Sequence, residues 1–231
     1  MFTLESISDI GCKRKDNQDN YWSSISMVDG VETGLLCVCD GMGGLENGAL
    51  ASKIIVEAIS EGFKDGIPFY ALKDVISSAN RRVYDLGSSE DKKMGTTCTV
   101  LQVCHGKWEI LHIGDSRCYR IHKEGSMQLL TTDHSAVKQL GITKESDPVK
   151  YKKYKNSLTR CIGIKPEVYA DYYKGTYERG DSFIVCSDGM WHLFEKEAFR
   201  GSDDLEDLRL LVKKCIDNGE TDNITCTKLL S

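Results

Sequence analysis

Leu36-Cys37-Val38-Cys39-Asp40-Gly41 is an apolar run that ends in an aspartate and a glycine, and the ending recurs along the chain. Similar acidic clusters follow or accompany other strand-like runs: Asn17-Gln18-Asp19, Ile113-Gly114-Asp115-Ser116, Val185-Cys186-Ser187-Asp188-Gly189 and Thr221-Asp222-Asn223-Ile224. An aspartate just past a buried strand lies where the chain leaves the sheet. Aspartates from distant parts of the sequence can therefore converge on one rim. A single cluster decides nothing, because Asp-Gly alone is typical of a turn.

Convergence of these carboxylates has a chemical consequence. Neighbouring carboxylates repel one another and resist ionising together unless a cation joins them. The clusters offer hard oxygen donors and no cysteine or histidine set suited to zinc. The pattern therefore predicts divalent metal ions bound through oxygen.

Length, composition and charge set the outer limits. The 231 residues, 40% hydrophobic and 28% charged, fit one globular domain. A net charge of -5 argues against a broad basic face for nucleic acid or anionic membrane. The N-terminus has no basic segment followed by an apolar stretch, and no 18 apolar residues run together, so we expect a cytoplasmic protein that does not span a membrane. The ten cysteines are expected to be reduced, small core residues.

Hydrophobic periodicity predicts strands alternating with pairs of helices. Apolar residues recur at helical spacing over 46–63, including Leu50 and Ile54, and again over 72–86. Alternation and turn signals predict a strand at 3–10, a hairpin around Asp29-Gly30, and a meander of four strands between 95 and 130. The polar, lysine-rich segment 136–157 is expected to be an irregular flap, followed by strands at 169–177 and 182–186, a helix at 204–216 and a strand at 223–230. Antiparallel sheets covered by helices follow from this order.

The order and content of the motifs resemble the metal-dependent serine/threonine phosphatases of the PPM, or protein phosphatase 2C, type. The resemblance begins with Arg14-Lys15-Asp16-Asn17-Gln18-Asp19 and Asp40-Gly41-Met42-Gly43-Gly44. It continues in the family's order with Gly95-Thr96-Thr97, Gly114-Asp115-Ser116-Arg117, Asp133-His134-Ser135, Leu158-Thr159-Arg160, Ser187-Asp188-Gly189 and Asp222-Asn223-Ile224-Thr225. It covers nearly the whole chain, which resembles the bacterial stand-alone catalytic domains.

The resemblance implies an α+β fold of four layers, an αββα sandwich in which two antiparallel sheets are flanked by helix pairs, with the metal centre at one rim. It implies one catalytic domain over 1–231. By this likeness, two Mn²⁺ or Mg²⁺ ions are held by Asp19, Asp40, the Gly41 carbonyl, Asp188 and Asp222, with Asp40 bridging them. A hydroxide between the metals would attack phosphoserine or phosphothreonine in line. Arg14 would clamp two phosphoryl oxygens with its planar fork.

Two departures from the family pattern affect these expectations. Met42 stands where many eukaryotic relatives have a histidine proposed as general acid, so the group that protonates the leaving alkoxide stays open. His192 stands where relatives often have an aspartate that helps to hold a third metal. With Asp115 and Asp188 present, a third ion is expected to bind, but more weakly.

Two other interpretations compete with the phosphatase. A pseudophosphatase that binds proteins through the same fold would normally have lost a core ligand, whereas Asp19, Asp40, Asp188 and Asp222 are all present. A dinucleotide-binding enzyme is disfavoured because the glycines after Asp40 lack the Gly-x-Gly-x-x-Gly spacing. The expected partners are phosphorylated proteins and an opposing serine/threonine kinase, with no nucleic acid and no membrane, and the expected state is a monomer. Lysines of the flap, Lys152, Lys153 and Lys155, are expected to attract acidic substrates.

Overall fold

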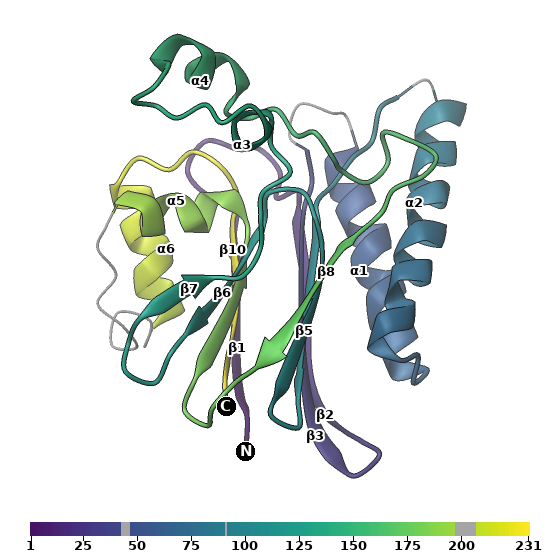
Figure 1. Cartoon of the computed structure of the whole chain (residues 1–231). Coiled ribbons are helices and arrows are strands. Elements are labelled where there is room, and N and C mark those ends of the chain that lie inside the picture. The colour runs from purple at the N-terminus through teal and green to yellow at the C-terminus, as the bar shows by residue number, and fades with distance from the viewer. Residues whose placement is uncertain (43–46, 91, 197–206) are drawn as a thin grey trace.

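Two antiparallel sheets of five strands each pack face to face in the computed structural model, with helices on both outer sides (Figure 1). The structure describes residues 1–42, 47–90, 92–196 and 207–231. Sheet A has the order β1-β10-β9-β6-β7, and sheet B has the order β2-β3-β4-β5-β8. The α+β sandwich predicted from the sequence is confirmed.

The strands and helices have the following bounds. Sheet A consists of β1 (Thr3–Asp9), β10 (Ile224–Leu230), β9 (Ser182–Cys186), β6 (Arg117–Ile121) and β7 (Met127–Leu129). Sheet B consists of β2 (Asp19–Val28), β3 (Val31–Asp40), β4 (Cys98–Cys104), β5 (Lys107–Ile113) and β8 (Asp171–Thr176). The helices are α1 (Gly48–Lys64), the short 3-10 helix η1 (Phe69–Ala71), α2 (Leu72–Ser89), α3 (Ala136–Gln139), α4 (Pro148–Tyr154), α5 (Asp188–Lys196) and α6 (Leu208–Asp217).

Three apolar clusters hold the layers together. One joins α1 and α2 to the outer face of sheet B, and a second joins α5 and α6 to the outer face of sheet A. The third lies between the sheets and includes Leu36, Leu101 and Phe183, all with 0% exposure. Burial on both faces explains why the central strands are continuous apolar runs in the sequence.

The β2–β3 hairpin fixes the register that the rim depends on. Its turn residues, Asp29 and Gly30, both have positive φ, 50° and 77°, as a two-residue type I′ turn requires. Val28 therefore pairs with Val31, and nine residues further from the turn Asp19 pairs with Asp40. The tight turn thus decides that these two aspartates lie side by side.

The helix pair over sheet B was predicted with one error in its buried face. In α2 the periodic residues Leu72, Ile76 and Val83 are buried as expected. In α1 the exposure of Leu50 is 44%, while Ala51 and Ile55 are fully buried. The error arose because Leu50 and Ala51 are both apolar, and periodicity alone does not say which of two adjacent apolar residues faces the sheet. The predicted helix begins at residue 46, which is outside the described residues. Residue 47 is the N-cap of α1.

The predicted meander between 95 and 130 is wrong in its topology. Strands β4 and β5 belong to sheet B, whereas β6 and β7 belong to sheet A. The chain changes sheets at Gly114-Asp115-Ser116, where Gly114 has φ 108° and an added Cβ would lie 2.5 Å from the Thr97 side chain. Alternation predicts strands but not sheet membership, and the crossing puts Asp115 at the rim.

Two other segments differ from the sequence prediction. The flap at 136–157 is not irregular but contains α3 and α4, whose N-caps Ser135 and Asp147 accept hydrogen bonds from backbone N–H groups within each first turn. Helix α5 was not predicted, and part of the helix expected at 204–216 lies outside the described residues, with α6 beginning at Leu208. Within the described ranges, no helix has the length and apolar character needed to cross a bilayer.

Candidate metal centre

Asp19 and Asp40 form the core of the acidic rim. They are opposite each other at the ends of β2 and β3, at the end of the sandwich away from the β2–β3 turn (Figure 1). The Ser187 hydroxyl donates a 2.7 Å hydrogen bond to Oδ2 of Asp19, which orients that carboxylate from the neighbouring sheet. The backbone N–H of Asp19 donates to the Asn17 side chain at 3.1 Å. Asn17 thus orders the turn that delivers Asp19.

The backbone of Asp40 is held from β4. Its N–H donates to the Thr97 hydroxyl at 2.9 Å, and its carbonyl accepts from the Thr97 N–H and the Thr96 hydroxyl, each at 2.9 Å. These contacts satisfy both backbone groups of Asp40 and fix the direction of its side chain. The Gly-Thr-Thr motif therefore positions Asp40.

Gly41 is required by close packing around its Cα. A Cβ at this position would lie 2.5 Å from the carbonyl oxygens of Gln18 and of Gly48. The N–H of Gly41 donates to the same Gln18 carbonyl at 3.1 Å. Glycine therefore lets the backbone at position 41 pass close to the chain at Gln18 and Gly48, directly after Asp40. Gly43 and Gly44 of the same motif are outside the described residues.

Asp188 and Asp222 reach the rim from the other sheet. Asp188 is the first residue of α5, directly after β9, and Asp222 lies in the loop before β10. A Glu220 carboxylate oxygen accepts the Asp222 N–H at 3.0 Å, and the Asn223 amide oxygen accepts the Gln18 N–H at 2.9 Å. The Asp222 loop is thus tied to the loop that carries Asp19.

The electrostatics of this rim favour a bound cation. Within the described part of the chain, Oδ1 of Asp19 and Oδ1 of Asp188 are buried without a hydrogen-bond partner. Burial raises the pKa of Asp19 to about 6 and that of Asp188 to about 8, and nearby carboxylates add to both shifts. Burial and the charges of Asp19 and Asp188 raise the pKa of Asp40 well above its ordinary value. Hard divalent ions would pair with the orphaned oxygens and offset the repulsion, so these residues fit the metals that the fold implies.

Asp115 lies close enough to raise the pKa of Asp188 by its charge, and its own pKa is raised to about 6 by burial and by Asp133. The Trp191 indole N–H donates to the Asp115 carbonyl at 2.9 Å. The stacked guanidinium of Arg117, 3.5 Å from the Trp191 ring centroid, supports that indole. Asp115 is thus part of the same acidic rim.

His192 does not point freely into the rim. Its Nδ1 lies 2.8 Å from Oε2 of Glu220, and its ring contacts Trp191 edge-on. Burial lowers the pKa of His192, but the hydrogen bond to Glu220 and the charge of Asp188 outweigh burial and raise it. His192 therefore braces Glu220, which in turn orders the Asp222 loop.

Arg14 is paired within the rim. Its Nη2 donates to Oδ2 of Asp222 at 2.5 Å, while its side chain is 38% exposed. The hydrogen bond to Asp222 raises the pKa of Arg14 against the opposing effect of burial, and the charges of Asp222, Asp188 and Asp40 raise it further. The guanidinium is thus a fixed cation at the exposed edge of the acidic cluster.

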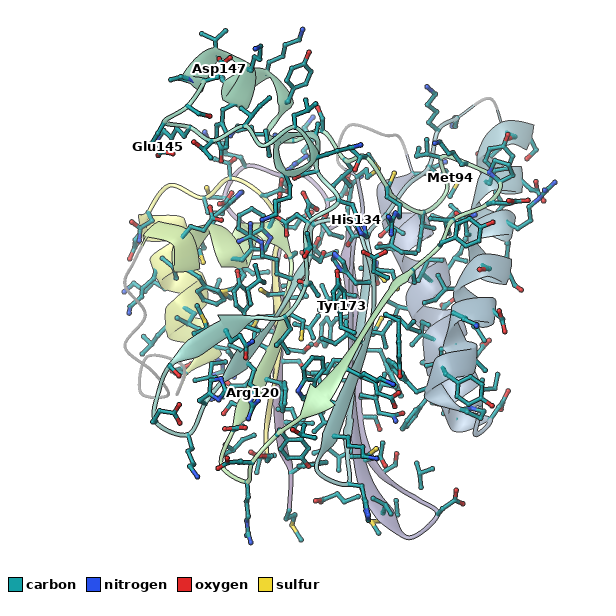
Figure 2. The ribbon with its side chains drawn as sticks, in the orientation of Figure 1. Met94, Arg120, His134, Glu145, Asp147 and Tyr173 are labelled. Atoms are coloured by element: carbon teal, nitrogen blue, oxygen red, sulfur yellow. The ribbon has the colours of Figure 1, made fainter. Side chains whose placement is uncertain are left out.

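His134 orders the base of the flap. Its Nδ1 accepts the Gly114 N–H at 3.0 Å, so the proton is on Nε2, which donates to Oδ2 of Asp171 at 3.0 Å (Figure 2). The Thr159 N–H donates to the His134 carbonyl at 2.7 Å. This residue links the Asp115 crossing to β8 and to the segment after α4.

Sequence reasoning missed three supporting groups: the hydroxyls of Ser187 and Thr97 and the carboxylate of Glu220. Ser187 and Thr97 belong to recognised motifs, but their roles depend on contacts across the two sheets. Glu220 had one available signal, its position two residues before Asp222.

Known proteins resemble this chain in sequence and in fold. Residues 13–218 match the family model described as protein phosphatase 2C. The chain is similar to protein phosphatase PhpP of Streptococcus pneumoniae, with 30% identity over 239 residues that cover 96% of this chain and 94% of that protein. The serine/threonine phosphatase structure from S. agalactiae is similar at a TM-score of 0.83 and 27% identity, covering 100% and 99% of the two chains. The PPM Ser-Thr phosphatase MsPP of Mycobacterium smegmatis, solved with cacodylate, has a TM-score of 0.82 and 28% identity, covering 99% and 97%.

The chain belongs to the protein phosphatase 2C family, whose members are metal-dependent phosphatases.

Proposed function

We propose that the acidic rim is the active site at which this protein, a serine/threonine protein phosphatase, hydrolyses phosphoserine and phosphothreonine in other proteins. The observation that carries the proposal is the pair of buried, unpartnered oxygens on Asp19 and Asp188, within a set of aspartates that raise one another's pKa values. Such an arrangement is unfavourable for a protein without bound cations and favourable for one that holds them.

Asp19, Asp40, the Gly41 carbonyl, Asp188 and Asp222 are the residues that would hold two ions, with Asp40 shared. When bound, two divalent ions activate a water molecule for in-line attack and neutralise charge on the phosphoryl group. Hard oxygen donors suit Mn²⁺ and Mg²⁺ alike. Asp115 is the proposed ligand of a third, weaker site, because its charge adds to that of Asp188.

Arg14 is proposed to bind the substrate phosphate. A planar fork can donate two parallel hydrogen bonds to phosphoryl oxygens, and the hydrogen bond from Arg14 to Asp222 holds the guanidinium at the site's exposed edge. Phosphate binding would transfer a donor from Asp222 to the substrate. Asp222 then gains freedom to act as a metal ligand, so the two events support each other.

A complete ligand set favours an enzyme over the pseudophosphatase alternative. The proposed partners are phosphorylated proteins and a serine/threonine kinase acting in opposition. One catalytic domain over 1–231, a monomeric state and a cytoplasmic location complete the proposal, and these remain predictions from the sequence.

The deciding experiment measures hydrolysis of para-nitrophenyl phosphate and of a phosphothreonine peptide, before and after exhaustive chelation and after return of Mn²⁺ or Mg²⁺. We expect activity to vanish on chelation and to return with either ion. Activity that survives chelation would overturn the metal-dependent mechanism. Metal-restored activity on the aryl phosphate with none on phosphopeptides would overturn the assignment of protein substrates.

A further inference from the structure

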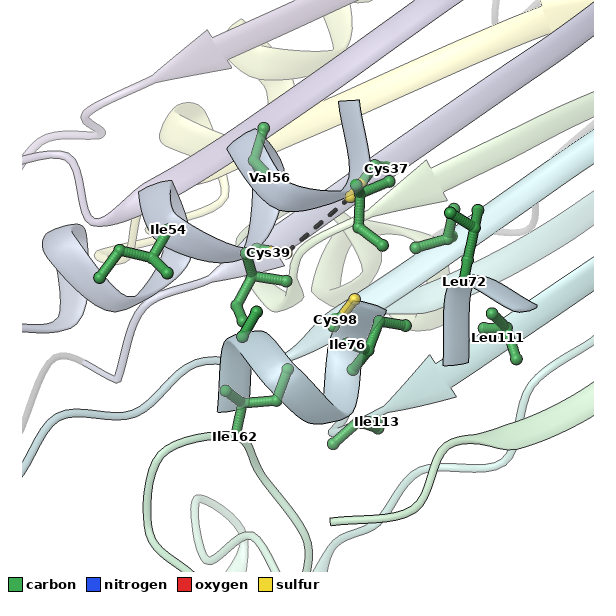
Figure 3. Packing of buried hydrophobic residues seen from close by; sticks show 14 of the residues in the cluster. Cys37, Cys39, Ile54, Val56, Leu72, Ile76, Cys98, Leu111, Ile113 and Ile162 are labelled. Carbon is green, nitrogen blue, oxygen red and sulfur yellow. Dashed lines mark hydrogen bonds between the residues drawn. The ribbon is translucent and has the colours of Figure 1, made fainter. Parts of the chain in front are cut away.

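Three cysteines gather at one point in the core, outside the acidic rim. Cys37 and Cys39 are two residues apart on β3, so their side chains project from the same face of sheet B. Cys98 begins the neighbouring strand β4 and lies beside them (Figure 3). All three have 0% exposure and belong to the cluster under α1 and α2.

The spacing of the sulfur atoms matches that of a metal site. The three Sγ atoms all lie within 4.8 Å of one another, and those of Cys37 and Cys39 are 3.9 Å apart. Three thiolates around an ion with bonds of about 2.3 Å would hold their sulfurs about 4 Å apart. Little backbone movement is therefore needed for all three to bind one ion.

We propose that Cys37, Cys39 and Cys98 form a binding site for one thiophilic divalent ion, of the class of Zn²⁺ and Cd²⁺, between sheet B and its helices. Sulfur ligands select soft ions, whereas the oxygen ligands of the rim select Mn²⁺ and Mg²⁺, so the two sites would sort metals by class. Binding releases the three thiol protons to solvent. Three thiolates leave a net charge of −1 around a divalent ion and of −2 around Cu⁺, so a divalent ion suits the apolar environment better.

The surroundings determine how an ion can arrive. Ile54, Leu72, Ile76 and Ile113 belong to the same buried cluster as the three cysteines, and each is at most 3% exposed (Figure 3). An ion must therefore bind during folding or when part of the helix layer opens. We expect slow loading of the folded protein and rapid loading during refolding.

Two of the three cysteines are adjacent in sequence to residues of the acidic rim. Cys39 directly precedes Asp40, and Cys98 directly follows Thr97, whose hydroxyl and N–H bond the Asp40 backbone. A bound ion would brace β3 against β4 at this point. An effect on phosphatase activity is expected from this proximity, and it rests on the proposed function, whereas metal binding by the three cysteines does not.

The test uses the whole chain with Cys12→Ala, because Cys12 is an exposed thiol that would bind metal unspecifically. The protein is refolded with excess Mn²⁺ and one equivalent of Cd²⁺, freed of unbound metal, and examined for the ultraviolet charge-transfer band of cadmium thiolates. We expect one tightly bound Cd²⁺ per chain with that band. Separate Cys37→Ala, Cys39→Ala and Cys98→Ala changes should each abolish or strongly weaken it.

Matched controls are Cys118→Ala and Cys226→Ala, since both cysteines are equally buried in other clusters. These controls should keep the band, and circular dichroism identifies any variant that fails to fold. A refolded protein with native circular dichroism and no band would overturn the proposal, as would a band that survives in folded variants of the three cysteines. Because the band requires no catalysis, a failure of the phosphatase assignment would leave this result readable.

Discussion

The Arg14 guanidinium donates a 2.5 Å hydrogen bond to Oδ2 of Asp222, although 208 positions separate the two residues in the sequence. The proposed phosphate-binding cation and a proposed metal ligand are therefore directly coupled. A substitution at Arg14 is expected to affect substrate binding and the ordering of the Asp222 loop together.

Variants of Arg14 test whether the planar guanidinium or only its positive charge is needed to bind phosphate. Arg14→Ala should lower kcat/KM at saturating metal by about 100-fold, since two charge-assisted hydrogen bonds to phosphate are lost. Arg14→Lys should recover little of this, because an ammonium cannot donate two parallel bonds in one plane. The measurement is kcat/KM for the three proteins at fixed metal. Full recovery by lysine would reduce Arg14 to a generic positive charge.

Asp40→Asn tests the ligand proposed to be shared by the two ions, and Asp29→Asn is a control with the same chemical change. The amide removes a negative charge from the place where two cations are proposed, so turnover should fall by orders of magnitude with the fold intact. Asp29→Asn changes the same dipeptide chemistry in the hairpin turn, where φ is 50° and asparagine is well tolerated. Turnover and thermal unfolding are measured for both. Wild-type turnover in Asp40→Asn at saturating metal would show that the ligand assignment is wrong.

The raised pKa values predict how the metal-free protein responds to pH. Asp19 and Asp115 have pKa values of about 6 and Asp188 of about 8 in the folded state, above their ordinary value of 3.8. The folded state then binds protons more tightly than the unfolded state. Protonation of these carboxyl groups therefore stabilises the fold fully below pH about 4, and this stabilisation is lost as the pH rises toward about 8.

Chemical unfolding in chelator should accordingly show a free energy of unfolding that falls across this range, on top of the titration of other groups. Saturating Mg²⁺ should remove most of the fall, because the ions replace the protons. A metal-free protein with the same pH profile as the metal-loaded one would contradict the proposed carboxylate cluster.

The flap lysines predict a substrate-dependent effect of salt. Lys152, Lys153 and Lys155 are exposed on and just after α4, at the end of the molecule that carries the rim (Figure 1). Changing all three to alanine should raise KM for phosphoproteins several-fold, more at low ionic strength, and leave para-nitrophenyl phosphate unaffected.

The matched control for the flap removes Lys64, Lys73 and Lys107, which are exposed elsewhere on the surface. Equal effects of the flap and control variants would indicate a general charge effect. A lowered kcat for both substrates in the flap variant would instead indicate that the flap positions catalytic groups.

How far sequence predicts this fold depends on the range of the interactions involved. Helix α2 and the β2–β3 hairpin follow from local periodicity and from Asp29-Gly30, so both were predicted. The assignment of β6 to sheet A was missed because β5 and β6 are consecutive strands that do not pair with each other. β5 pairs with β4 and the distant β8, whereas β6 pairs with β7 and the distant β9. Helix α5 was missed because it has only nine residues, too few to show a clear helical period, and because its start coincides with the Ser-Asp-Gly motif.

The residues of the candidate site divide in the same way, into those with local signals and those that depend on long-range contacts. The acidic residues were found because each stands beside one end of a strand-like run, which is a local signal. The hydroxyl of Ser187 that orients Asp19, and the His192–Glu220 pair that orders the Asp222 loop, depend on packing between distant segments. Local patterns do not report such contacts.

Among the described residues, β1 has one neighbour in its sheet, β10, with Thr3 paired to Leu230. A growing chain on the ribosome therefore exposes β1 as an unpaired edge until β10 has been translated. Asp222 lies just before β10 and emerges at the same stage. A chain released before this point would lack both the pairing of β1 in sheet A and the full ligand set, so catalytic competence is expected to arise only after β10 has been made.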